Sequence, residues 1–222
     1  MSLFQYSVIT TTDGSSTVID SIHKEHFHST FGAITESLYI YINHGLKVVA
    51  KPNVRILEVG FGTGLNCLLT ILNKNNDQII LYHTIEKYPL PGYITNELNY
   101  HSLLNTSQQL YQSLHSFNWN VEKEFLENFI LKKYKVDLLD FIPGFKYDLI
   151  YFDAFSHSVQ PELWSSDIFN KMFSCLNPGG LLITYSVKGE VKKALRIAGF
   201  EVKRIAGPPG KRHILQAYSP FH

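Results

Sequence analysis

The stretch Ile56-Leu-Glu-Val-Gly-Phe-Gly-Thr-Gly64 combines an apolar run, an acidic residue and three alternating glycines. The apolar run predicts a buried strand, and residues 64–72 predict a helix directly after it. Glycines between a strand and a helix let the backbone approach a ligand where a side chain would block it. A dinucleotide-binding turn has the spacing G-x-G-x-x-G, but here Leu65 stands at the last position and the third glycine comes one residue early. This spacing disfavours NAD as the ligand.

The rest of the chain alternates short apolar runs with helix-length segments, which indicates a mostly parallel sheet with helices on both faces. The predicted strands of this sheet lie at residues 55–59, 78–85, 147–152 and 180–185. Residues 190–198 predict a helix that Gly199 ends. Two last strands, at 200–205 and 213–218, flank a glycine and proline turn and predict an antiparallel hairpin. The sequence therefore predicts an α/β fold.

The N-terminal residues fit this rhythm poorly. We therefore expect residues 1–50 to form an extension packed on the core and residues 51–222 to form the main domain, with a helical region at 89–117. No repeat or linker divides the chain, and 222 residues suffice for a core without a disulfide. Cys67 and Cys175 form no close-spaced pair, which disfavours a zinc cluster. The spacing of His23, His26 and His28 lacks acidic or thiol partners and also disfavours a metal site.

Charge and hydropathy narrow the class further. The chain has 20 Lys and Arg against 19 Asp and Glu, and 45% hydrophobic residues, which excludes a disordered chain. It contains no apolar run of membrane-spanning length and no N-terminal signal sequence, so we expect a cytoplasmic protein. The segment between Lys188 and Arg212 carries eight basic and two acidic residues. This imbalance is typical of a phosphate-binding face, although a solvated helix surface would look the same.

Acidic residues follow the predicted strands. Glu58 precedes the glycines, and a carboxylate there would repel a pyrophosphate but attract an ammonium or sulfonium group. The segment resembles motif I of the class I S-adenosylmethionine-dependent methyltransferases. This resemblance implies a Rossmann-like, mostly parallel, seven-stranded sheet and S-adenosyl-L-methionine as cofactor. The residues it assigns to the cofactor are Glu58, Gly60, Gly62 and Gly64 in the turn, Glu86 for the ribose hydroxyls and Asp137, with Asp140 as its competitor, for the adenine amino group.

A second segment is more specific. Asp153-Ala-Phe-Ser-His-Ser-Val-Gln-Pro-Glu-Leu-Trp164 resembles the D-x-F-x-P-x-x-N-P-x-x-W signature of the MnmC-type tRNA methyltransferases. His28-Ser29 and the hairpin text at 207–212 are also similar to this family, and the likeness covers most of residues 10–217. Two departures, His157 for proline and Gln160 for asparagine, affect the shape of the loop and not the acid. The family methylates the amine of 5-aminomethyl-2-thiouridine at the wobble position of tRNA.

This resemblance gives Asp153 its role. An ammonium cannot attack a methyl group, so the site must generate the free amine, and Asp153 would orient the amine and accept its proton. Phe155 and Trp164 would stack on the flipped base, or belong to the core. Lys211 and Arg212 would bind phosphates, since a glycine and proline turn is expected to present both outward. Four more phosphate candidates are Lys188, Lys192, Lys193 and Arg196.

Partners and alternatives follow from the same reasoning. The expected partner is the anticodon region of tRNA, with no membrane, no metal and no FAD. The chain has no room for the flavin-dependent oxidase domain of some relatives, so a separate enzyme would supply the aminomethyl precursor. One alternative is a polyamine aminopropyltransferase of the same fold. Another is a non-catalytic RNA-binding domain, which would have no need for Glu58, Glu86 and Asp153 together. The sequence leaves the oligomeric state open.

Overall fold

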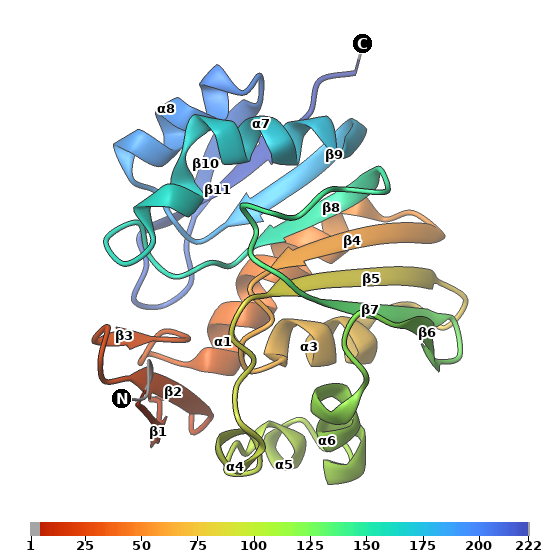
Figure 1. Cartoon of the computed structure of the whole chain (residues 1–222), viewed down its shortest axis with the longest axis vertical. Coiled ribbons are helices and arrows are strands. Elements are labelled where there is room, and N and C mark those ends of the chain that lie inside the picture. The colour runs from red at the N-terminus through yellow and green to blue at the C-terminus, as the bar shows by residue number, and fades with distance from the viewer. Residues whose placement is uncertain (1–4, 222) are drawn as a thin grey trace.

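The computed structural model describes residues 5–221 and is organised around one mixed sheet (Figure 1). In these residues the sheet has eight strands in the order β10-β11-β9-β8-β4-β5-β7-β6. The five strands from β9 to β7 in this order run parallel, while β10, β11 and β6 pair antiparallel with their neighbours. The strands are β4 (Asn53–Val59), β5 (Ile79–Glu86), β6 (Glu122–Leu126), β7 (Phe129–Lys135), β8 (Tyr147–Phe152), β9 (Leu176–Thr184), β10 (Glu201–Ala206) and β11 (His213–Tyr218).

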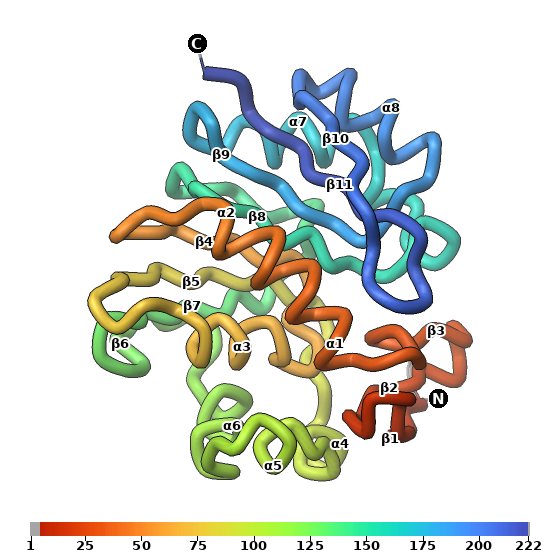
Figure 2. The backbone as a smooth tube through the Cα atoms, turned by 180° about the vertical axis from the view of Figure 1, so that it is seen from behind, coloured from red at the N-terminus to blue at the C-terminus, as the bar shows by residue number. Residues whose placement is uncertain are grey.

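Helices cover both faces of this sheet, which explains why its strands read as continuous apolar runs. On β8, Leu149 and Tyr151 face one core cluster, whereas Ile150 and Phe152 face the other. The segment from α1 to α2 crosses the face seen in Figure 2, together with α3, and α7 and α8 cover the opposite face. The helices are α1 (Ala33–Ser37), the π-helical η1 (Leu38–Leu46), α2 (Lys47–Val49), α3 (Leu65–Asn73), α4 (Gly92–Thr95), α5 (Tyr100–Leu103), α6 (Gln108–Ser116), the 3-10 turn η2 (Pro161–Trp164), α7 (Ser166–Ser174) and α8 (Gly189–Ile197).

The N-terminal region carries a small sheet of its own. Its strands are β1 (Tyr6–Thr10), β2 (Ser16–Asp20) and β3 (Glu25–His26), paired antiparallel. The sequence analysis did not predict these strands, because their residues lack a clear alternation of apolar and polar side chains. Residues 1–4 of the predicted extension and residue 222 of the predicted main domain lie outside the described residues.

The predicted α/β fold is confirmed, with one correction to the strand count. The sheet has eight strands in the described residues and not seven, because β6 adds an antiparallel edge strand to β7. Its sequence, Glu-Lys-Glu-Phe-Leu, is mostly charged and exposed, so no apolar run signals it. The predicted helical region at 89–117 contains α4, α5 and α6.

The topology brings the ends of four parallel strands to one edge. The residues that follow β4, β5, β7 and β8 include Gly60, Glu86 at the end of its own strand, Asp137 and Asp153. In parallel sheets ligands bind in the crevice outside these carboxyl ends. None of the helices in residues 5–221 has the length and hydropathy needed to cross a membrane.

Candidate active site

A cavity of about 630 Å³ opens at this edge of the sheet. Its wall includes residues from β3, from the turns after β4, β5, β7 and β8, and from the loop between β10 and β11. Seven of the residues that the sequence analysis assigned to cofactor, catalysis or acceptor line it: Gly60, Gly62, Glu86, Asp137, Asp153, Phe155 and Lys211. Four others, Glu58, Gly64, Trp164 and Arg212, are not among its described lining residues. Asp140 is exposed and outside the wall, so Asp137 is the acid of this pair that faces the cavity.

The glycine turn is shaped by close backbone contacts. Gly60 has a φ of 90°, and a Cβ atom at this position would lie 2.5 Å from the backbone oxygen of Asp153. Only glycine fits there without moving the loop after β8. The backbone N–H of Gly62 donates to Oε2 of Glu86 at 3.0 Å, which ties the turn to the end of β5. The turn therefore presents backbone to the cavity in a fixed position.

The two acids after β5 and β7 are held differently. Burial raises the pKa of Glu86, and backbone N–H groups of Tyr88 and Gly62 oppose this rise by donating to its two oxygens. Partial burial would also raise the pKa of Asp137, but Lys87, 2.6 Å away, and the backbone N–H of Leu139 hold that pKa below its usual value. A carboxylate has about four lone-pair sites, so each group keeps acceptor capacity for a ligand.

Asp153 stands beside the glycine turn with its carboxyl in a polar but desolvated setting. The Asn66 amide donates to its Oδ2 at 2.8 Å. Burial raises the pKa of Asp153 to about 6, against the lowering effect of the Tyr41 hydroxyl and the Asn66 amide. A carboxyl with this pKa is mostly ionised at neutral pH and is a better proton acceptor than an ordinary aspartate. Asn66 and Tyr41 were not predicted, because η1 and α3 reach Asp153 only in the fold.

Glu58 lies beneath the turn and not in the cavity. Its side chain is fully buried, and neither carboxyl oxygen has a hydrogen-bond partner of good geometry among residues 5–221. Burial raises the pKa of Glu58 well above its usual value, although the nearby side chains of Thr84, Tyr82 and Asn66 act to lower it. The expectation that its charge attracts a cationic ligand needs correction, since it has no place in the cavity wall and its environment disfavours the charged form.

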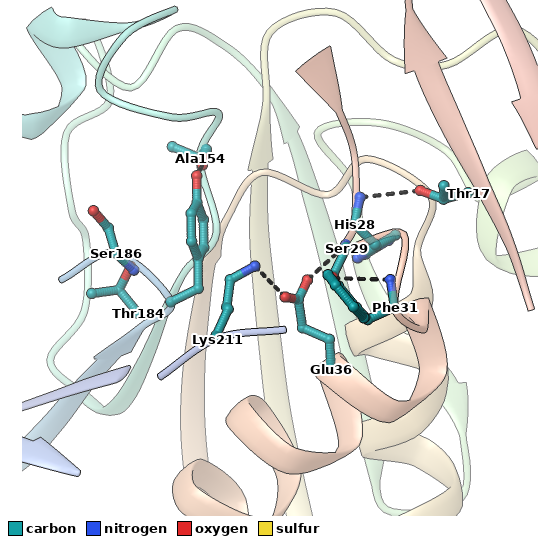
Figure 3. A network of polar contacts seen from close by, with 10 residues as sticks. Thr17, His28, Ser29, Phe31, Glu36, Ala154, Thr184, Ser186 and Lys211 are labelled. Atoms are coloured by element: carbon teal, nitrogen blue, oxygen red, sulfur yellow. Dashed lines mark hydrogen bonds and ion pairs between the residues drawn. The ribbon is translucent and has the colours of Figure 1, made fainter. Parts of the chain in front are cut away.

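Lys211 requires a second correction. The sequence analysis expected the hairpin turn to present this residue outward, but its ammonium group pairs with Oε2 of Glu36 inside the cavity wall (Figure 3). Its side chain is 25% exposed and that of Glu36 only 9%. Oε1 of Glu36 accepts a hydrogen bond from the backbone N–H of Ser29 at 3.0 Å. Glu36 was missed because its partner is 175 residues away in the sequence.

For Trp164 the structure selects the second of the two alternatives that the sequence left open. It is 2% exposed and packs against Phe152, Phe169 and Tyr185, so it belongs to the core and does not stack on a ligand. Its Nε1 donates to the backbone oxygen of Phe155 at 2.8 Å, which fixes the loop after Asp153. Phe155 itself lines the cavity, and its ring forms a T-shaped contact with that of Phe27.

The N-terminal region adds a histidine to the cavity. Nε2 of His28 lies 2.8 Å from Oγ1 of Thr63, in the turn before α3, and burial lowers the pKa of His28 to about 4. The imidazole is therefore neutral near pH 7 and serves as a hydrogen-bond partner, not as a charge. Among the described residues no group of three or more His, Cys, Asp or Glu side chains is arranged to hold a metal ion.

A cationic cluster lies beside the cavity on α8 and the last hairpin. Desolvation lowers the pKa of the His213 imidazole, and the positive charges of Arg204, Arg212 and Lys192 lower it further. Arg212 is exposed and follows Lys211, whose ammonium faces the cavity. The two neighbouring residues therefore point to different environments.

Comparisons with known proteins bear on this site. A family model described as S-adenosyl-L-methionine-dependent methyltransferase matches residues 100–220. The tRNA 5-methylaminomethyl-2-thiouridine biosynthesis bifunctional protein MnmC of Actinobacillus pleuropneumoniae serotype 5b (strain L20) is 26% identical over 231 aligned residues, covering 94% of this chain and 34% of that protein. The chain thus spans about a third of the length of the curated relatives it matches.

Solved structures give the same picture of the fold. The crystal structure of MNMC2 from Aquifex aeolicus matches with a TM-score of 0.79 and 27% identity, covering 98% of this chain and 71% of that one. Spermidine synthase from Thermotoga maritima matches with a TM-score of 0.58 and 10% identity, covering 100% of this chain and 72% of that one. The second likeness concerns the fold alone.

Proposed function

This chain belongs to the S-adenosyl-L-methionine-dependent methyltransferases, and on that premise we propose that it methylates the amine of 5-aminomethyl-(2-thio)uridine at the wobble position of tRNA. The observation that carries the proposal is the Asp153 carboxyl, which stands in the cavity beside the glycine turn with its pKa raised to about 6. The name of the Actinobacillus relative supports the choice of nucleoside.

The cavity wall fits the cofactor. A Cβ atom at Gly60 would fill the close approach of the turn, and the backbone there can lie against the methionine part of the ligand. Glu86 would accept hydrogen bonds from the ribose hydroxyls, and Asp137 would accept one from the adenine amino group. When bound, the cofactor supplies an electrophilic methyl group on its sulfonium.

Asp153 would handle the proton of the acceptor. The amine arrives mostly as an ammonium, whose nitrogen has no lone pair for attack. Asp153 would orient it, and the proton would pass to Oδ1 directly or through a water. Asn66 holds Oδ2 at 2.8 Å and so fixes the direction of the carboxylate. Holding the amine and the methyl group in line supplies a further advantage of about 7 to 11 kcal/mol in well-oriented systems.

Groups behind the wall would support this geometry. We assign Glu58, in its protonated form, to the buried layer beneath the turn, near Asn66. Phe155 would contact the base of the acceptor, with Trp164 fixing its loop. We also propose that residues 1–50 act as an extension that completes the cavity wall on the 51–222 domain.

The surface beside the cavity suits a nucleic acid. A cationic cluster is formed by Arg212, Arg204 and Lys192 around His213. Such clusters bind backbone phosphates independently of the nucleotide sequence. We propose that this cluster contacts the tRNA backbone, in the cytoplasm. Methyl transfer does not create the aminomethyl group, so a separate activity must form it. An aminopropyltransferase is not favoured, because the spermidine synthase likeness is one of fold and the cationic cluster does not suit a polyamine acceptor.

The test is methyl transfer from labelled S-adenosyl-L-methionine to tRNA that carries unmethylated aminomethyluridine. Putrescine with decarboxylated S-adenosylmethionine, which donates an aminopropyl group and leaves as methylthioadenosine, tests the alternative in a parallel reaction, and mass spectrometry identifies the products. One added methyl group on the wobble nucleoside is the expected result. Cofactor binding without transfer to either acceptor would contradict the proposed acceptor and leave the methyltransferase fold in place.

A further inference from the structure

The ion pair between Glu36 and Lys211 joins two distant parts of the chain in the wall of the cavity (Figure 3). Glu36 lies in α1 and Lys211 in the loop between β10 and β11, and both line the cavity that Asp153 lines. The Lys211 ammonium also lies 5.1 Å from the centre of the Tyr185 ring. The Glu36 carboxylate, the Lys211 ammonium and the proposed catalytic carboxyl of Asp153 therefore line the same cavity.

The loop holds Lys211 in this inward position. Its backbone N–H donates to the oxygen of Pro208 at 2.9 Å, and the N–H of Gly207 donates to the oxygen of Arg212 at 3.2 Å. A Cβ atom at Gly207 would lie 2.3 Å from the Lys211 oxygen, so the loop closes as tightly as it does only because this residue is glycine. A lysine ammonium held in this position is not available to bind an RNA phosphate.

The charges of these three groups can be counted. Asp153 and Glu36 are acidic and Lys211 is basic, so one negative charge remains when all three are ionised. That net charge matches a single ammonium on the acceptor. The groups that influence Asp153 are Glu36 from α1, Tyr41 from η1, Glu58 from β4, Tyr185 after β9 and Lys211 from the hairpin loop.

We propose that Lys211 is a positioning residue that neutralises Glu36, so that Asp153 is the carboxylate left to meet the acceptor amine. The inference rests on the proposed function for the identity of the amine. Its physical basis is the ion pair, the shared cavity wall and the low exposure of both side chains. Lys211 therefore acts on the chemistry through Glu36 and Asp153, and does not hold the RNA.

Removing Lys211 and removing Glu36 should shift the pKa of Asp153 in opposite directions. In Lys211→Met, the unpaired Glu36 carboxylate would disfavour the charged form of Asp153 and raise its pKa. In Glu36→Gln, the unpaired lysine would favour the charged form and lower it. We expect each of these shifts to be roughly one pH unit. The double variant should return close to the wild-type value, because both charges are gone.

The experiment measures kcat and KM for methyl transfer to aminomethyluridine tRNA as a function of pH. The midpoint of the acidic limb of the kcat profile is expected to shift up by roughly one pH unit in Lys211→Met and to shift down in Glu36→Gln. In the double variant it should return to the wild-type position. Lys203→Met is the matched control, since its ammonium also lies over a tyrosine ring, that of Tyr218 at 4.9 Å, but outside the cavity wall. Its pH profile should equal that of the wild type.

A second readout separates this role from RNA binding. The salt dependence of tRNA affinity should be the same in Lys211→Met and the wild type, because no phosphate contact is lost. A flatter salt dependence with an unmoved pH profile would overturn the inference and return Lys211 to the RNA surface. Thermal unfolding of each variant checks that it is folded.

The inference remains testable if the proposed acceptor is wrong. A wild-type protein that methylates no tRNA would contradict the proposed function alone. In that case, carbon NMR titration of the Asp153 carboxyl in the same five proteins gives the pKa values directly. Opposite shifts in the two single variants would support the role of the ion pair, and equal pKa values in all of them would contradict it.

Discussion

The two halves of the cavity are built by different kinds of contact. The half with Gly60, Glu86 and Asp137 comes from turns directly after parallel strands, and backbone N–H groups fix its acids. The half with Glu36 and Lys211 comes from α1 and the last hairpin, and side chains far apart in sequence hold it together. The first half is local and the second is not. A local design is visible in a sequence as a motif, and a non-local one is visible only in the fold.

Asp153 lies between the two halves, and its removal should have the largest effect. In Asp153→Asn, the proton acceptor is lost while the backbone of the glycine turn is kept. The rate of methyl transfer should fall by about 10²- to 10⁴-fold, with cofactor affinity nearly unchanged. Single-turnover kinetics and calorimetric cofactor binding measure the two effects. Asp140→Asn, at an exposed acid outside the cavity wall, is the matched control. Equal losses of transfer and binding would remove Asp153 from the role of base.

A substitution at Gly60 should disrupt the local half of the cavity. In Gly60→Ala, the new Cβ atom would meet the Asp153 oxygen at 2.5 Å, at a φ of 90° that alanine rarely adopts. Strain of this kind costs about 1 to 3 kcal/mol, and cofactor affinity should fall as well. Gly189→Ala is the control, because nothing lies within 4 Å of its added atom. Thermal unfolding with and without cofactor measures both effects. If Gly60→Ala behaves like the wild type, the close approach is not what requires glycine.

A substitution of Asn66 tests how Asp153 is held between the two halves. In Asn66→Ala, the 2.8 Å hydrogen bond to Asp153 is lost, and a bond to a charged group is worth about 1.5 to 3 kcal/mol. The expected result is a fall in kcat of about 10- to 100-fold with KM little changed. Asn73→Ala removes an amide from the same helix, one that donates to the Leu69 oxygen at 2.8 Å, and should leave kcat unaffected. Similar kcat values for both variants would show that Asn66 does not position Asp153.

Glu58 should have the smallest effect on methyl transfer and a distinct effect on stability. Its folded-state pKa lies above the unfolded one, so its contribution to stability is complete below the unfolded pKa and is lost as the pH rises through the folded pKa. This loss amounts to at most about 1.4 kcal/mol per pH unit. In Glu58→Gln the group no longer titrates, and the free energy of unfolding should fall less between pH 4 and the folded pKa. Chemical denaturation at a series of pH values measures it. Parallel curves for both proteins would mean that Glu58 does not hold its proton.

The sequence predicted the local half in detail. The strand predicted at 147–152 matches β8, and Glu86 and Asp137 line the cavity at strand ends, as the resemblance to the methyltransferases implies. It did not predict Glu36, Tyr41 or Asn66, since nothing near these residues signals which distant side chain they meet. Lys211 was placed wrongly, and Trp164 was left undecided, for a related reason. A charge in a turn and an aromatic in a loop have the same local sequence whether they face solvent or the interior.

The pairing of Glu36 with Lys211 also sets an order of events during synthesis. The ribosome makes Glu36 175 residues before its partner, and at about 5 to 20 residues per second this interval is roughly 10 to 35 s. The nascent chain therefore carries the strands and turns of the cofactor half well before the acceptor half can close. A ligand that binds the first half could meet a folding chain, whereas the acceptor finds a complete site only after the last hairpin has formed.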